Sequence, residues 1–154
     1  MLFGSLFKAR GGEVVVRLDD NLRHLLRQVT EELREILLVD DDEHTRRLYP
    51  TAHPDDEELE QQYREMVRDQ LLMQRLDGID RLQATIDAET LDVELADIWM
   101  NTINQARLVL GTQLDVGEND GPIEEEDPDA TQKVIYQVLS HILEELTSAR
   151  IRLL

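Results

Sequence analysis

The stretch from Asp92 to Gly111, DVELADIWMNTINQARLVLG, decides the fold class of this chain. Its apolar side chains recur every three or four residues, which is the spacing of one face of an α-helix. Asp92 is placed to cap the start of this helix, and Gly111 is placed to end it. The expected inner face consists of Leu95, Ile98, Trp99, Thr102, Ile103, Ala106, Val109 and Leu110. We therefore predict a helix over residues 92–111, with Trp99 as a core residue.

Three further segments have the same helical spacing of apolar residues. These helices are expected over residues 19–39, 56–88 and 128–152. Asp19 or Asp20 can cap the first of them, and Gly78 either bends or divides the second. Asp127 and Pro128 are expected to open the last helix as its N-cap and its first residue. The chain is thus predicted to be mainly α.

The N-terminal residues 1–18 are expected to form a β-hairpin. Gly11 and Gly12 can supply the positive φ angles of a tight turn, and the three valines at 14–16 favour extended backbone. A hairpin alone is marginal in water, so it should pack on the helices. The predicted architecture is a four-to-five-helix bundle with a short N-terminal β-hairpin, in a single domain of residues 1–154.

The charge of the chain argues against nucleic acid as a partner. Its 34 acidic and 16 basic residues give a formal net charge of −18. Such a surface repels the phosphate backbone, which supplies most of the affinity in nucleic-acid binding. Direct DNA binding is therefore not expected. The acidic segment 115–126 is expected to be an exposed loop.

The chain has no cysteine. Disulfides, thiol nucleophiles and Cys-ligated zinc are therefore excluded. No apolar run approaches the roughly 20 residues of a membrane-spanning helix, and the N-terminal sequence MLFGSLFKARGG lacks the charged and apolar regions of a signal peptide. We expect a cytoplasmic protein without membrane contact.

Residues 52–57, AHPDDE, spell the signature of zinc-dependent de-N-acetylases of the LmbE type. This resemblance implies that His53 and Asp56 would bind the metal and that Asp55 would act as the general base. A zinc hydrolase needs such ligands, an open position for water and a nearby base. The segment therefore supplies one hypothesis for function, a metal-dependent hydrolase.

The surroundings of AHPDDE oppose that hypothesis. Residues 44–50 are charged and contain Pro50, so they cannot be the buried central strand that carries the signature in those enzymes. None of the other three histidines belongs to an HxxH pair, and no alternating βαβ pattern is present. We predict that the protein is not an enzyme and holds no metal. Asp55 and Asp56 would then cap a helix, with His53 in the preceding loop.

Polar residues also lie beside the apolar face of the helix predicted over residues 92–111. They are Asn101, Asn104, Gln105 and Arg107. Polar groups next to a core need hydrogen-bond partners. We expect hydrogen bonds between helices, and a ligand pocket is the alternative.

Several short segments together resemble an actinobacterial family of unknown function. They are RRLYP at 46–50, Asp55-Asp56, Tyr63-Arg64, Trp99, NQARLVLG at 104–111 and Leu114. Members described functionally are oxidative-stress transcriptional regulators of the AosR type. The residues singled out by this resemblance as a signature or binding set are Arg46, Arg47, Tyr49, Pro50, Trp99, Asn104, Arg107 and Gly111.

This resemblance implies a cofactor-free regulatory protein that acts through protein contacts, with a partner in the transcription machinery. Sensing through thiols is impossible here because the chain has no cysteine. Apolar residues off the main helical faces, such as Leu71, Met73, Met100 and Leu108, suggest a homodimer. An acidic scaffold module that recruits basic partners is a further alternative.

The metal hypothesis has a direct test. Metal analysis of the purified protein is expected to find no bound zinc, and added zinc should leave the melting temperature unchanged. A ligand that binds the native state would raise that temperature by mass action. Stoichiometric zinc that disappears in His53→Ala would contradict the prediction.

Overall fold

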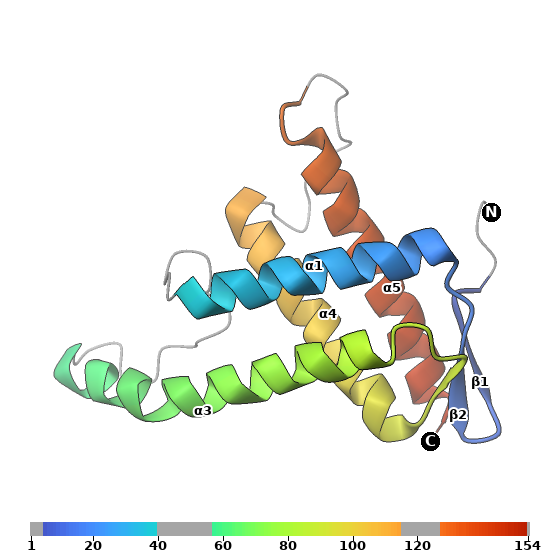
Figure 1. The fold of residues 1–154 in the computed structure, drawn as a ribbon, viewed down its shortest axis with the longest axis horizontal. Coiled ribbons are helices and arrows are strands. Elements are labelled where there is room, and N and C mark those ends of the chain that lie inside the picture. The colour runs from blue at the N-terminus through green and yellow to red at the C-terminus, as the bar shows by residue number, and fades with distance from the viewer. Residues whose placement is uncertain (1–4, 40–56, 115–126, 154) are drawn as a thin grey trace.

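The computed structural model describes residues 5–39, 57–114 and 127–153. These residues form the helices α1 (Asp20–Val39), α3 (Glu57–Ala84), α4 (Val93–Leu114) and α5 (Ala130–Ile151), and the strands β1 (Phe7–Arg10), β2 (Glu13–Val16) and β3 (Thr90–Leu91). Figure 1 shows α4 behind α1 and α3, with the hairpin at one end of the bundle. The predicted fold class, a helical bundle with an N-terminal β-hairpin, is confirmed. None of the described helices is both long and apolar enough to span a membrane.

The hairpin is one part of a three-stranded antiparallel sheet in the order β1-β2-β3. Gly11 and Gly12 have φ angles of 60° and 80°, so the turn uses the glycines as the sequence indicated. The third strand was not predicted, because two residues are too few to show a periodic pattern. It pairs Leu91 with Val14, and both side chains are fully buried.

Aspartate side chains cap two of the helices, as the sequence predicted. The backbone N–H of Leu22 donates to Asp19 Oδ1 at 2.8 Å at the start of α1. The N–H of Leu95 donates to Asp92 Oδ1 at 2.8 Å at the start of α4. Each bond satisfies one of the amide groups that a first helical turn leaves without a partner.

Two helix ends differ from the prediction. Helix α4 continues through Gly111 to Leu114, because Gly111 is buried and lacks the positive φ of a C-terminal cap. Helix α5 begins at Ala130 and not at Pro128. Asp127 accepts from the N–H of Asp129 at 2.8 Å in a turn ahead of the helix. Gly78 does not divide α3, which ends at Ala84.

Helix α4 is the central element, because it packs against α1, α3 and α5. Its Trp99 is fully buried in the main core, where Nε1 donates to Thr85 Oγ1 at 2.9 Å. The other fully buried large side chains of this main core include Leu26, Leu82, Leu91, Ile103, Leu139, Ile142 and Leu146. A second core between α1, α3 and α4 contains Leu33, Leu37, Ile79, Ala106 and Val109. Trp99 is thus a core residue, as predicted.

Arg23 connects α1 to the turn that follows α3. Arg23 donates to the backbone oxygens of Leu18 at 3.0 Å, Ile86 at 2.6 Å and Ala88 at 3.1 Å. Hydrogen bonds from a charged donor are among the stronger ones in proteins. The guanidinium therefore donates hydrogen bonds to backbone oxygens that lie outside the helices and the sheet.

Gly78 allows α3 and α4 to approach closely. A Cβ atom added to this glycine would lie 2.8 Å from Thr102 Oγ1, closer than real Cβ contacts. Thr102 is only 2% exposed and its β-branched side chain has few alternative rotamers. The helix spacing at this level consequently requires a residue without a side chain.

Gly78→Ala should lower stability, although the same change inside an exposed helix usually gains about 0.5–1 kcal/mol. Overpacking costs about 1–3 kcal/mol, so we expect a net loss of about 1 kcal/mol in urea unfolding. The matched control is the same change in a Thr102→Ala background, where it should raise stability. A gain in the otherwise unaltered chain would contradict the close contact.

Candidate functional site

Part of the sequence-predicted set lies outside the described residues. It comprises Arg46, Arg47, Tyr49, Pro50, His53, Asp55 and Asp56. Among the described residues, no group of three or more His, Asp or Glu side chains is placed to hold a metal ion. The roles of the AHPDDE residues therefore stay predictions.

Asn104 and Arg107 meet on the side of α4 that faces α5. Arg107 Nη2 donates to Asn104 Oδ1 at 3.1 Å, and Nη1 donates to Tyr136 Oη at 3.2 Å. The guanidinium carbon lies 5.6 Å from the centroid of the Tyr136 ring, within the range of a cation–π contact. Arg107 thus connects α4 to α5 by a hydrogen bond between helices, whereas its bond to Asn104 lies within α4. Tyr136 was missed because nothing in the sequence indicates its pairing.

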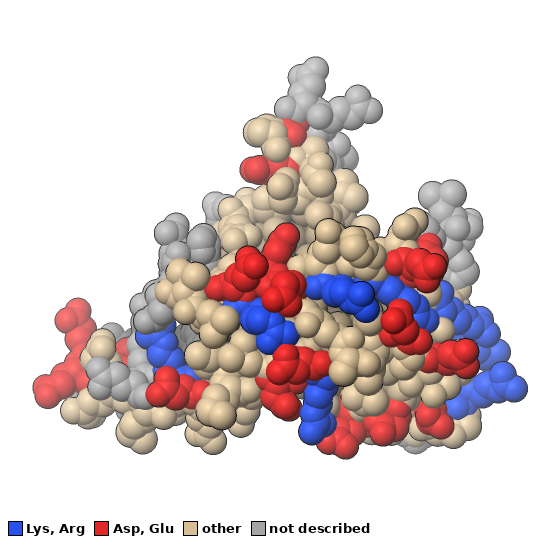
Figure 2. All heavy atoms as spheres, in the orientation of Figure 1, with Lys and Arg blue, Asp and Glu red and all other residues tan. Residues whose placement is uncertain are grey.

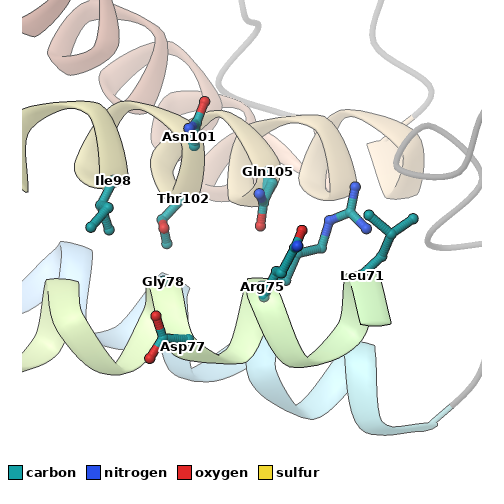
Figure 3. A pocket seen from close by; sticks show the side chains of 9 residues that line it. Leu71, Arg75, Asp77, Gly78, Ile98, Asn101, Thr102 and Gln105 are labelled. Atoms are coloured by element: carbon teal, nitrogen blue, oxygen red, sulfur yellow. The ribbon is translucent and has the colours of Figure 1, made fainter. Parts of the chain in front are cut away.

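A polar pocket of about 220 Å³ opens between α3 and α4. Its lining residues are Leu71, Gln74, Arg75, Asp77, Gly78, Ile98, Asn101, Thr102 and Gln105. Figure 3 shows Thr102 and Gln105 pointing from α4 toward α3, with Arg75 extending toward α4 from the opposite side. Asn101 and Gln105 thus line a pocket, whereas Asn104 and Arg107 do not. The ligand pocket named as the alternative from the sequence stays a prediction.

The hydrogen bonding in this pocket is incomplete within the described part of the chain. Gln105 Oε1 is buried and has no hydrogen-bond partner there. Thr102, which is only 2% exposed, brings its hydroxyl into the same pocket. A buried polar atom without a partner costs about 1–3 kcal/mol. Such an atom beside a second, nearly buried polar side chain marks the pocket as a candidate binding site.

Helix α3 carries an exposed apolar line from its first turn to Met73. Leu59, Met66 and Met73 follow one another at intervals of seven residues and are 45%, 78% and 71% exposed. All residues that α3 contributes to the two cores come from Leu72 onward. In Figure 1 the start of α3 extends past the neighbouring helices. We call residues 57–71 the α3 arm, and Leu59, Met66 and Met73 the apolar line.

The other apolar residues suggested for an intermolecular face have different positions. Met100 and Leu108 are half-buried and pack against the two cores, while Leu71 lines the polar pocket. Only Met73 of that set is strongly exposed. Helical spacing alone did not distinguish the exposed residues from the half-buried ones, because some of them are covered by packing against a further helix.

Basic side chains along α1 are interleaved with acidic ones on the face shown in Figure 2. Arg27 lies 3.8 Å from Asp87, and Arg34 lies 2.7 Å from Asp80. Hydrogen bonds from Gln83 and then from Arg34 lower the pKa of Glu31. Arg27 and Arg34 are thus paired with carboxylates of the same surface. This pairing agrees with the expectation that the surface does not bind the phosphate backbone of nucleic acid.

Comparison with known proteins identifies the family. The sequence model of a domain of unknown function, DUF2017, matches residues 4–150. Comparisons with curated proteins and with solved structures gave no match. Because the match spans nearly the whole sequence, the chain belongs to the DUF2017 family of proteins of unknown function.

Proposed function

We propose that this protein is a cofactor-free regulatory interaction protein, and that it pairs with a second copy through the apolar line of α3. The observation that carries the proposal is the exposure of Met66 and Met73, at 78% and 71% of their surface. Large apolar side chains aligned on one helix face are typical of interaction surfaces. This apolar line contrasts with the rest of the chain, which has a formal net charge of −18.

The spacing of the apolar line suits a second copy of the same helix. A seven-residue interval keeps apolar residues on one seam when two helices pack side by side. In an antiparallel pair centred on Met66, Leu59 of one copy would face Met73 of the other. Such an interface is isologous, with the same surface used on both chains.

The charges of the arm favour the same arrangement. Its first turn carries Glu57, Glu58 and Glu60, whereas Arg68 follows later on α3. Antiparallel pairing places the acidic turn of one copy beside the arginine-bearing stretch of the other. Three apolar side chains per copy form a narrow seam, so we expect a dissociation constant of about micromolar order.

Support for a regulatory role comes from the resemblance to oxidative-stress regulators of the AosR type. We propose that the protein works in the cytoplasm on a partner of the transcription machinery. A protein partner suits the charge better than DNA does, because net negative charge opposes phosphate contact. The signal would differ from thiol oxidation, since the chain contains no cysteine.

The pairing is tested by sedimentation velocity over a range of protein concentrations. The unaltered chain should shift from monomer to dimer, and Met66→Glu or Met73→Glu should remain monomeric because a charge would be buried in the seam. The control is Ile151→Glu, which places the same charge on another exposed apolar position, on α5, at 59% exposure. A monomer at all concentrations, or a dimer unaffected by both methionine changes, would refute the pairing.

The regulatory role is tested by crosslinking in cells followed by mass spectrometry. A component of the transcription machinery should be recovered with the unaltered chain at physiological salt. Partners that are all highly basic and that dissociate at moderately raised ionic strength would instead indicate an acidic scaffold, because screening removes exposed charge contacts. That outcome would overturn the regulatory proposal.

A further inference from the structure

We infer that the polar pocket between α3 and α4 binds a small zwitterion, a molecule with the ammonium and carboxylate groups of a free α-amino acid. This inference goes beyond the proposed pairing, since it concerns a different surface and a different class of ligand. It rests on the chemistry of Thr102, Gln105 and Arg75 and on the size of the cavity.

Two acceptors in the pocket call for a ligand that donates hydrogen bonds. Gln105 Oε1 is buried without a partner among the described residues, and Thr102 Oγ1 lies one helical turn away on the same face of α4. An ammonium group has three N–H donors and no acceptor. It can therefore donate to both oxygens at once, which removes the cost of leaving Gln105 Oε1 unpaired.

The opposite side of the pocket suits a carboxylate. Arg75 reaches from α3 into the gap beside Gln105 (Figure 3). Its guanidinium has five N–H donors in a fixed plane, so it can bind a carboxylate beside the contacts that it already makes. A plain anion such as phosphate fits less well, because its oxygens would face Gln105 Oε1, an acceptor.

The dimensions of the cavity limit the ligand further. A volume of about 220 Å³ is the space of roughly seven water molecules. It is smaller than the pockets of roughly 300–1,000 Å³ that hold drug-sized ligands. Gly78 contributes to this space, since a Cβ there would meet Thr102 Oγ1 at 2.8 Å. Ile98 and Leu71 add apolar contacts for a short aliphatic side chain.

The experiment measures binding to the full-length protein with named probes. Glycine, L-serine, L-glutamine and L-leucine are titrated up to about 10 mM by calorimetry and by thermal shift, beside sodium phosphate and ammonium acetate. At least one of the amino acids should bind saturably and raise the melting temperature, whereas the two salts should not. Equal binding of phosphate would overturn the zwitterion assignment.

Variants separate a binding role from a structural one. Thr102→Val and Gln105→Leu should each weaken binding at least about tenfold while leaving the ligand-free protein as stable or more stable, because an unpaired polar group is replaced by an apolar one. The matched control is Thr112→Val on the same helix. The Thr112 hydroxyl donates to the Leu108 oxygen at 3.0 Å, so its loss should lower stability and leave binding unchanged.

Two further binding results would overturn the inference. One is the absence of any binding by the four amino acids over the whole concentration range. The other is binding that Thr102→Val and Gln105→Leu leave at full strength, since the ligand would then occupy another site. Loss of stability in the ligand-free Thr102→Val variant would also count against the inference, because it would mean that the hydroxyl already has a structural partner.

Discussion

The close approach of α3 and α4 at Gly78 and Thr102 is the constraint on which the rest of the structure depends. From this contact toward the hairpin, the two helices stay together through the bond from Trp99 Nε1 to Thr85 Oγ1. In the other direction they leave room for the polar pocket, whose lining includes both contact residues. Since α4 also packs on α1 and α5, the position of α3 is set relative to the whole bundle.

The polar residues of α4 have different surroundings on two sides of the helix. Asn104 Oδ1 accepts from Arg107 Nη2, and Arg107 Nη1 donates to Tyr136 of α5, although Arg107 Nε is buried without a partner among the described residues. Thr102 and Gln105 face α3, and Gln105 Oε1 is buried without a partner among the described residues. Successive helical residues are about 100° apart around the axis. Neighbours such as Asn104 and Gln105 can therefore have entirely different surroundings.

The sequence predicted those features that arise from local chemistry. Apolar spacing located the helices, the glycine pair located the hairpin turn, and Asp19 and Asp92 were recognised as caps. The prediction from sequence failed where packing overrides a local signal. Gly111 is an ordinary helix-ending residue by type, yet burial keeps it within α4. The strand β3 is too short for any pattern, because its two residues are held only by pairing with β2.

The candidate site was predicted only in part, for a physical reason. Polar residues beside the face of α4 raised the possibility of a pocket, but its other wall comes from α3, and sequence spacing does not say which helices become neighbours. Leu71 and Gln74 of that wall lie on either side of Met73, where the α3 arm leaves the second core. The pocket and the apolar line therefore meet at one junction on α3. They remain separable, because Met66 lies outside the pocket lining and Thr102 lies on a different helix from the arm.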